Sequence, residues 1–434
     1  MATSDRSKPA DAVPADLLPI IRNSGILNER QFLDIRTKVT NGEYPEDPKI
    51  LGQFLVRDGI LTDYQVRRFL SGKSHGLMVG KYVILDRLGS GSMGRVYKAH
   101  HQLMGRVVAL KIIAPELVTN DRVTSRFQRE MKLVGRLDHP NVVRAYDADQ
   151  ANGILYIVME YVSGISLGQR LKQGPLAPVD VVTYAAQAAL GLHHAHEQGI
   201  VHRDIKPSNL LLNDEKQIKV LDLGLGVLMD GDSQSTFATA DGVAVGTVDY
   251  MSPEQACGRD VDGRSDLFSL GCSMYHLITG RQAFPGETPI ERLGRRINNR
   301  HVPITDLRPD IPASLVAVLD KLLANKPQDR YQTAGEAAEA LSGLVKSRKA
   351  IAAAAQAKKD AAEAAPSPVA VKAVMQPVET PAPVIVKVEP NYPGWFAPLA
   401  RLAENRPGLA LSAVIGGLGA SGLIGFLLGW LLMP

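Results

Sequence analysis

A glycine-rich loop, Gly89-Ser-Gly-Ser-Met-Gly94, lies between two segments that favour β-strands, and few folds place glycines in this way. Backbone N–H groups approach a phosphate closely only where no Cβ intervenes, so this spacing is typical of nucleotide-binding loops. A P-loop would continue with Lys and Ser or Thr, but Arg95 follows the last glycine. A dinucleotide site would open a helix here, whereas residues 95–99 and 106–113 are rich in Val, Ile and Tyr. The loop therefore predicts a turn between two antiparallel strands.

A single lysine follows this loop on the next predicted strand. Lys111 ends the segment Val108-Ala-Leu-Lys111, and Glu130 lies in a helical run over residues 124–136. A lysine that contacts phosphates needs an acid to hold its long side chain in place. Taken alone, the two residues could equally be surface charges. With the motifs that follow, we predict that Glu130 positions Lys111.

A polar segment further along the chain, His202-Arg-Asp-Ile-Lys-Pro-Ser-Asn209, carries several groups suited to phosphate chemistry. Asp204 can accept a proton from a hydroxyl group, and Lys206 can neutralise a phosphate. Asn209 offers an oxygen ligand for Mg²⁺, and Asp222, in Asp-Leu-Gly, offers a carboxylate for the same purpose. These residues form the candidate catalytic centre.

With Gly246-Thr247 and the segment 250–254 (Tyr-Met-Ser-Pro-Glu) added, residues 81–344 resemble a eukaryotic-type bacterial serine/threonine protein kinase domain of the receptor-kinase group. The resemblance implies an α+β, bilobal protein kinase fold that uses ATP and Mg²⁺ to phosphorylate serine or threonine in protein substrates. Lys206 and Thr247 favour serine and threonine over tyrosine as acceptors. The resemblance also implies that the catalytic residues are Asp204, Lys206, Lys111 and Glu130.

The same resemblance assigns the nucleotide site. Met159 is similar to the gatekeeper residue before the hinge, and an apolar group is expected to enclose the adenine ring. Asp266 matches the acid that braces the catalytic loop, and Arg330 matches the partner of Glu254. The expected ATP-binding residues are Leu88, Gly89, Gly91, Gly94, Val96, Ala109, Lys111, Met159, Glu160, Val162 and Leu211.

Two positions differ from the family pattern: Leu223 replaces a phenylalanine and Ser252 replaces an alanine. Leucine keeps an apolar side chain, and an inactive relative usually lacks Lys111, Asp204 or Asp222, so we expect an active enzyme. The alternative is a scaffold whose kinase fold binds ATP as a structural switch without transferring phosphate.

The resemblance also leads us to expect autophosphorylation of an activation loop over residues 225–245. Thr239 is the first predicted site and Thr236 the second, because Arg203 offers a partner for phosphate.

His193 and His196 lie three residues apart on a predicted helix, and we interpret them as packing side chains rather than metal ligands. The net charge of +4 gives no case for nucleic-acid binding.

Residues 1–77 predict a small helical regulatory or docking module. The phrase Gly-Ile-Leu with a glutamine six residues after the glycine occurs at 25–31 and again at 59–65. Thr62 and Gln65 have capping-box spacing, so a helix should begin there and run through Leu70, and Asn28 with Gln31 repeats this more weakly. The segment Leu51-Gly-Gln-Phe-Leu-Val-Arg-Asp-Gly-Ile-Leu61, followed by Val66 and Leu70, is similar to the amino-terminal domains of type II secretion and type IV pilus ATPases. Ile50 stands where those that bind cyclic dinucleotides have arginine, so we expect no such ligand.

The carboxy-terminal part predicts a membrane anchor. Residues 345–407 form an Ala/Lys-rich and then Pro-rich linker, and residues 409–433 are almost wholly apolar or small. As a helix this stretch would span roughly 37 Å, more than the ~30 Å hydrocarbon core. Arg401 and Arg406 precede it, so we expect a single-pass protein of the bacterial inner membrane whose kinase domain lies in the cytoplasm. We expect no domain on the far side of the membrane. Small residues recur at four-residue spacing and suggest a homodimer through this helix: Ala413, Gly417, Ser421, Gly425 and Gly429.

Overall fold

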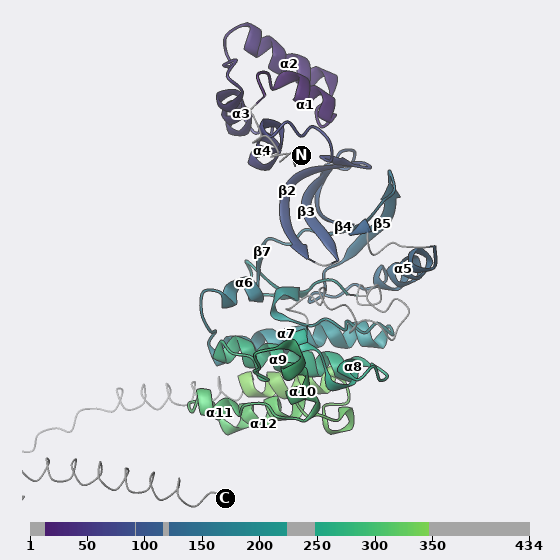
Figure 1. The fold of residues 1–434 in the computed structure, drawn as a ribbon, viewed down its shortest axis with the longest axis vertical. Helices are drawn as coiled ribbons and strands as arrows, with labels where there is room; N and C mark the ends of the chain where they lie inside the picture. Colours follow the sequence, from purple (N-terminus) through teal and green to yellow (C-terminus); the bar gives the residue numbers. More distant parts are fainter. Residues whose placement is uncertain (1–13, 92, 116–120, 224–247, 347–434) are drawn as a thin grey trace, which may run out of the picture. The chain divides into compact units, whose positions relative to one another are not determined.

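The structure, a computed structural model, describes residues 14–91, 93–115, 121–223 and 248–346 (Figure 1). All of these belong to the first of two compact units, Met1–Ala364. Thr236, Thr239, nearly all of the predicted linker and the apolar stretch 409–433 lie outside the described residues. Within the ranges just given, no helix combines the length and the apolar character that a membrane span requires.

Four short helices open the described chain, and both predicted capping boxes are present. Asn28 caps one helix and Thr62 another, each exchanging hydrogen bonds with the glutamine three residues on. The helix after Thr62 ends at Leu70, as predicted. The helices are α1 (Leu18–Ser24), α2 (Glu29–Thr40), α3 (Pro48–Arg57) and α4 (Asp63–Leu70).

A six-stranded antiparallel sheet follows, with strand order β1-β2-β3-β4-β6-β5. The glycine loop joins two neighbouring antiparallel strands, β2 and β3, which confirms the predicted turn. Helix α5 (Asp121–Val134) packs beside the sheet through Phe127, which joins a small apolar cluster with Ile113 and Ile157. The strands are β1 (Met78–Val79), β2 (Tyr82–Gly91), β3 (Gly94–His101), β4 (Arg106–Ile113), β5 (Ala145–Ala151) and β6 (Ile154–Glu160).

The remaining residues form a mainly helical lobe around two buried helices, α7 and α9. Alanines along α7 allow close approach to α9, whose side chains are almost all buried. The lobe contains α6 (Leu167–Leu171), α7 (Pro178–Glu197), η2 (Pro207–Asn209), η4 (Val248–Tyr250), α8 (Pro253–Ala256), α9 (Gly263–Thr279), α10 (Pro289–Ile297), α11 (Ile304–Leu307), α12 (Ala313–Leu322), η5 (Pro327–Asp329) and a last helix over 334–346. A small sheet, β7 (Gly164–Ser166), β8 (Leu210–Asn213) and β9 (Ile218–Val220), lies at its junction with the six-stranded sheet.

Candidate active site

One cleft of about 1290 Å³ gathers nearly all of the residues that the sequence singled out. It is lined by strands of the six-stranded sheet on one side and by the catalytic segment and β8 on the other. Of the predicted catalytic, nucleotide and metal residues, only Glu130 is not part of the lining. Those that line it are Leu88, Gly89, Gly91, Gly94, Val96, Ala109, Lys111, Met159, Glu160, Val162, Asp204, Lys206, Asn209, Leu211 and Asp222.

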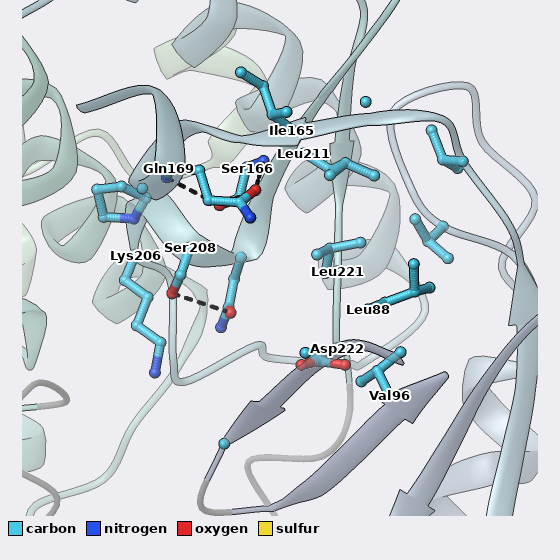
Figure 2. Close-up of a pocket in the computed structure, with 18 of the residues that line it drawn as sticks. Leu88, Val96, Ile165, Ser166, Gln169, Lys206, Ser208, Leu211, Leu221 and Asp222 are labelled. Carbon is cyan, nitrogen blue, oxygen red and sulfur yellow. Dashed lines mark hydrogen bonds between the residues drawn. The ribbon is translucent and has the colours of Figure 1, made fainter. Parts of the chain in front are cut away.

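Apolar side chains form one end of this cleft. In Figure 2, Leu88, Val96 and Leu221 lie on one side of the cleft and Lys206 lies on the other. Met159 pairs with Ala109 across β6 and β4. Leu221 was missed by sequence reasoning, as were Val143 and Ile165. Leu221 could have been predicted to line the cleft, because it directly precedes Asp222 in the Asp-Leu-Gly motif.

The three loop glycines differ in why glycine is needed. Gly94 has φ of 135°, and a Cβ there would lie 2.0 Å from the carbonyl oxygen of Ile112. Gly89 and Gly91 have no atom within 4 Å of an added Cβ. The fold itself therefore requires Gly94, whereas Gly89 and Gly91 leave open space on the cleft, where a phosphate could approach the backbone.

We expect Gly94→Ala to destabilise the protein, because it combines a strained backbone with a collision against a main-chain oxygen. The free energy of unfolding should fall by about 1–3 kcal/mol or more. Gly91→Ala is the matched control: it should leave thermal stability nearly unchanged but weaken nucleotide binding, because its methyl group would face the ligand. Thermal unfolding and nucleotide titration of both variants measure this. Equal stability of the two variants would contradict the steric account.

Lys111 forms an ion pair inside the cleft, but not with the predicted partner. Its Nζ lies 2.7 Å from Oδ2 of Asp222, and its side chain is only 4% exposed. Among the described residues there is no ion pair between Lys111 and Glu130, so the expected pair is replaced by one with Asp222. A buried ammonium needs an opposite charge. Asp222 meets this need from a left-handed backbone conformation, with φ of 60°.

The catalytic segment is held together by its own side chains. Lys206 Nζ lies 2.7 Å from Oδ2 of Asp204. Asn209 donates through Nδ2 to the main-chain oxygen of Asp204 at 2.8 Å and to its carboxylate at 3.2 Å. Oδ1 of Asn209 accepts only a long bond of 3.5 Å from the Ser208 hydroxyl, and the carboxylate of Asp222 contacts Lys111 through Oδ2, so both side chains offer oxygen ligands to the cleft. Hard oxygen ligands of this kind fit Mg²⁺.

A buried carboxylate braces this segment from below. Asp266 accepts hydrogen bonds from the main-chain N–H groups of His202 at 2.9 Å and Arg203 at 2.8 Å, as predicted. His196 Nε2 lies 2.8 Å from the same carboxylate, a contact that sequence reasoning did not find. Burial alone would raise the pKa of Asp266, but the bond from His196 and the neighbouring charges and amides hold it below its ordinary value.

The structure explains one departure from the family pattern and one predicted ion pair in the helical lobe. Ser252 accepts a hydrogen bond from the main chain of Gln255, so serine in place of alanine caps α8. The Gln255 side chain also donates to the main-chain oxygen of Arg203 at 2.8 Å, which ties α8 to the catalytic segment. Glu254 and Arg330 form the predicted pair, with two bonds of 2.7 and 2.8 Å, both side chains being buried.

Comparison with known proteins agrees with this geometry. The sequence matches the protein kinase domain family over residues 82–342, which is more than half of the chain. The chain belongs to the protein kinase family. This kinase chain is 37% identical over 291 residues to a probable serine/threonine-protein kinase of Corynebacterium efficiens, a match that covers 64% of this chain and 44% of that protein.

Other relatives carry similar names. Identity is 38% over 261 residues to serine/threonine-protein kinase PknB of Mycolicibacterium smegmatis, covering 59% of this chain and 41% of PknB. The match thus spans less than half of the length of these curated relatives. A crystal structure of the Mycobacterium tuberculosis PknI kinase domain is also similar, with 30% identity and a TM-score of 0.48, covering 61% of this chain and 97% of that one.

Proposed function

We propose that this chain is a serine/threonine protein kinase that transfers the γ-phosphoryl group of ATP to hydroxyl groups of protein substrates. The observation that carries the proposal is that Lys206 and Asn209 both bond to Asp204, in a cleft that also holds Lys111 and Asp222. The names of the curated relatives support serine and threonine as acceptors.

In the proposed reaction each group has a separate role. Asp204 orients the acceptor hydroxyl and takes up its proton as the hydroxyl oxygen bonds to the γ-phosphorus and the bond to ADP breaks. Lys206 offsets negative charge on the transferred group, and Lys111 contacts the α- and β-phosphates. Asn209 and Asp222 would hold Mg²⁺, which would neutralise charge on the phosphates.

The existing ion pairs are compatible with these roles. The ammonium groups of Lys111 and Lys206 are each 2.7 Å from a carboxylate oxygen, so they can exchange a carboxylate contact for a phosphate contact. Glu130 would pair with Lys111 if Asp222 released the ammonium group and α5 moved toward the sheet.

The test is transfer of label from γ-labelled ATP with Mg²⁺ to a generic protein substrate, followed by phosphoamino-acid analysis. The proposal predicts phosphoserine and phosphothreonine. Nucleotide binding without any transfer would instead support the alternative, a scaffold that uses ATP as a structural switch.

We also propose autophosphorylation at Thr239 and Thr236. Support comes from the sequence, because both threonines lie between Asp222 and Glu254, where protein kinases carry their activation loops. A phosphate there would add charge that can pair with a cationic side chain.

A membrane tether through residues 409–433 is the third part of the proposal, with the kinase domain in the cytoplasm and the helix able to dimerise through its small residues. The length and apolar character of this stretch support it. We expect the full chain to sediment with membranes and to resist extraction with salt or alkaline carbonate. A chain ending at Arg406 should move to the supernatant. Equal partitioning of the two chains would contradict the tether.

A further inference from the structure

The second copy of the amino-terminal repeat is built into the sheet lobe. Helix α4 contacts β2, and one apolar cluster contains residues of both. From the helical module it includes Leu61, Val66 and Phe69, and from the sheet it includes Ile84 and Tyr97. The two parts thus share one core.

Two side chains of the α4 capping box also bond to the backbone of β2. Thr62 donates through its hydroxyl to the main-chain oxygen of Leu85. Gln65 donates through Nε2 to the main-chain oxygen of Ile84 at 2.8 Å, while its Oε1 accepts from the N–H of Thr62 at 2.9 Å. Gln65 is only 3% exposed. A buried amide with both ends engaged holds its partners in one geometry.

These bonds satisfy a sheet edge. Strand β1 pairs with β2 at Tyr82 and Val83, and the N–H of Ile84 still bonds to the main-chain oxygen of Leu77 at 2.8 Å. No residue of β1 lies opposite the carbonyl groups of Ile84 and Leu85. Unpaired main-chain oxygens at a buried edge are unfavourable. The Thr62 and Gln65 side chains bond to main-chain oxygens where no residue of β1 lies opposite. Figure 1 shows α4 beside the end of β2.

The same stretch of β2 leads directly into the nucleotide cleft. The register between β2 and β3 shifts between Ile84 and Asp86 and again between Arg87 and Gly89, so Leu85 and Leu88 are the extra residues. Leu88 lines the cleft, three residues beyond Leu85, or about 10 Å at the ~3.3 Å rise of a strand. Bulges bend and twist a strand and so aim the residues that follow. The position of Leu85 therefore affects that of the glycine loop.

The first copy of the repeat lacks this contact. Asn28 and Gln31 form the same capping box on α2, yet Gln31 is exposed. In the described part of the chain, the Gln31 side chain bonds only to Asn28. The two copies share the local helix signal, and only the second has the added bond to the sheet.

We propose that Gln65 and Thr62 are positioning residues for ATP: they fix the bulged part of β2 so that Leu88 and the glycine loop cover the nucleotide. This rests on the proposed kinase function, because the ligand of the cleft is taken to be ATP. Neither residue lines the cleft, and both would act through Ile84 and Leu85.

The test compares Gln65→Met with Gln31→Met in the full chain. Methionine keeps the length of the side chain and removes the amide, so both variants lose a capping bond and only the first loses the bond to β2. We expect Gln65→Met to raise KM for ATP, and the Kd of a fluorescent ATP analogue with Mg²⁺, by about 2- to 10-fold, the effect of one ordinary hydrogen bond. kcat should stay within about 2-fold, and Gln31→Met should match the wild type.

A second pair separates positioning from folding. Thr62→Val should raise KM as Gln65→Met does, while Thr62→Ser keeps the hydroxyl and should restore the wild-type value. This pair decides the matter if Gln65→Met does not fold. Lower thermal stability with unchanged KM and Kd, or an equal rise in Gln31→Met, would overturn the positioning role. If the wild type bound the analogue but transferred no phosphate, the kinase proposal would fail while the Kd comparison would still test Gln65.

Discussion

Asp204→Asn is expected to lower phosphate transfer by about 10²–10⁴-fold, the usual contribution of a positioned proton acceptor. Asparagine keeps the shape of the side chain but cannot take up the hydroxyl proton, and it removes the charge that faces Lys206 at 2.7 Å. Lys111→Met should cause a loss of similar size through the phosphate contact. Initial rates with γ-labelled ATP measure both.

Controls separate these losses from misfolding. Asp214→Asn changes an exposed carboxylate in the same lobe and should leave the rate unchanged. Circular dichroism and thermal unfolding should show that Asp204→Asn retains the fold, since Asp204 is only partly buried and Asn209 can still donate to its main-chain oxygen. Transfer near the wild-type rate by the folded Asp204→Asn protein would remove the proposed role.

Arg330→Met is expected to cost about 3–5 kcal/mol of folding free energy, because it leaves Glu254 as an uncompensated buried charge. Arg330 contacts both oxygens of this carboxylate and also donates to the main-chain oxygens of Ala324 and Asn325. Denaturant unfolding measures the loss. The matched control is Arg295→Met, which removes an exposed pair with Glu291 within α10 and should have a far smaller effect.

The pH dependence gives this prediction a second readout. Burial alone would raise the pKa of Glu254, but the bonds from Arg330 and Ser265 outweigh it and hold the pKa below its ordinary value. A lowered pKa contributes stability above the unfolded-state value of about 4.3, and this stability is lost as pH falls through the folded-state pKa. The difference between wild type and Arg330→Met should therefore stay nearly constant from pH 7 to about pH 5 and shrink as the pH falls below about 4. A difference that does not change with pH would contradict the ionic account.

The sequence predicted the contents of the cleft well, since the fixed spacing within residues 202–209 leaves little freedom. Asp204 and Asn209 come together because one short segment carries both, and Asp266 and Arg330 could be assigned by their motifs. The partner of Lys111 could not be predicted in the same way. It depends on where α5 sits relative to the sheet, and no local pattern encodes that distance.

The sequence also could not predict the long-range contacts of residues that a local pattern already explained. His196 fitted the pattern of a packing side chain, and its bond to Asp266 joins residues 70 positions apart. Thr62 and Gln65 formed a recognisable capping box, which explained them fully as a helix start. Their bonds to Ile84 and Leu85 depend on how a helix meets a sheet edge, which only the packed structure shows.

The most direct measurement of the central claim is phosphosite mapping by mass spectrometry on purified protein incubated with ATP and Mg²⁺, with Asp204→Asn treated in parallel. The account predicts phosphate on serine and threonine of the wild type, with Thr239 the most occupied site and Thr236 next, and none on Asp204→Asn. Wild-type protein without phosphate, or equal phosphate on the two proteins, would contradict it.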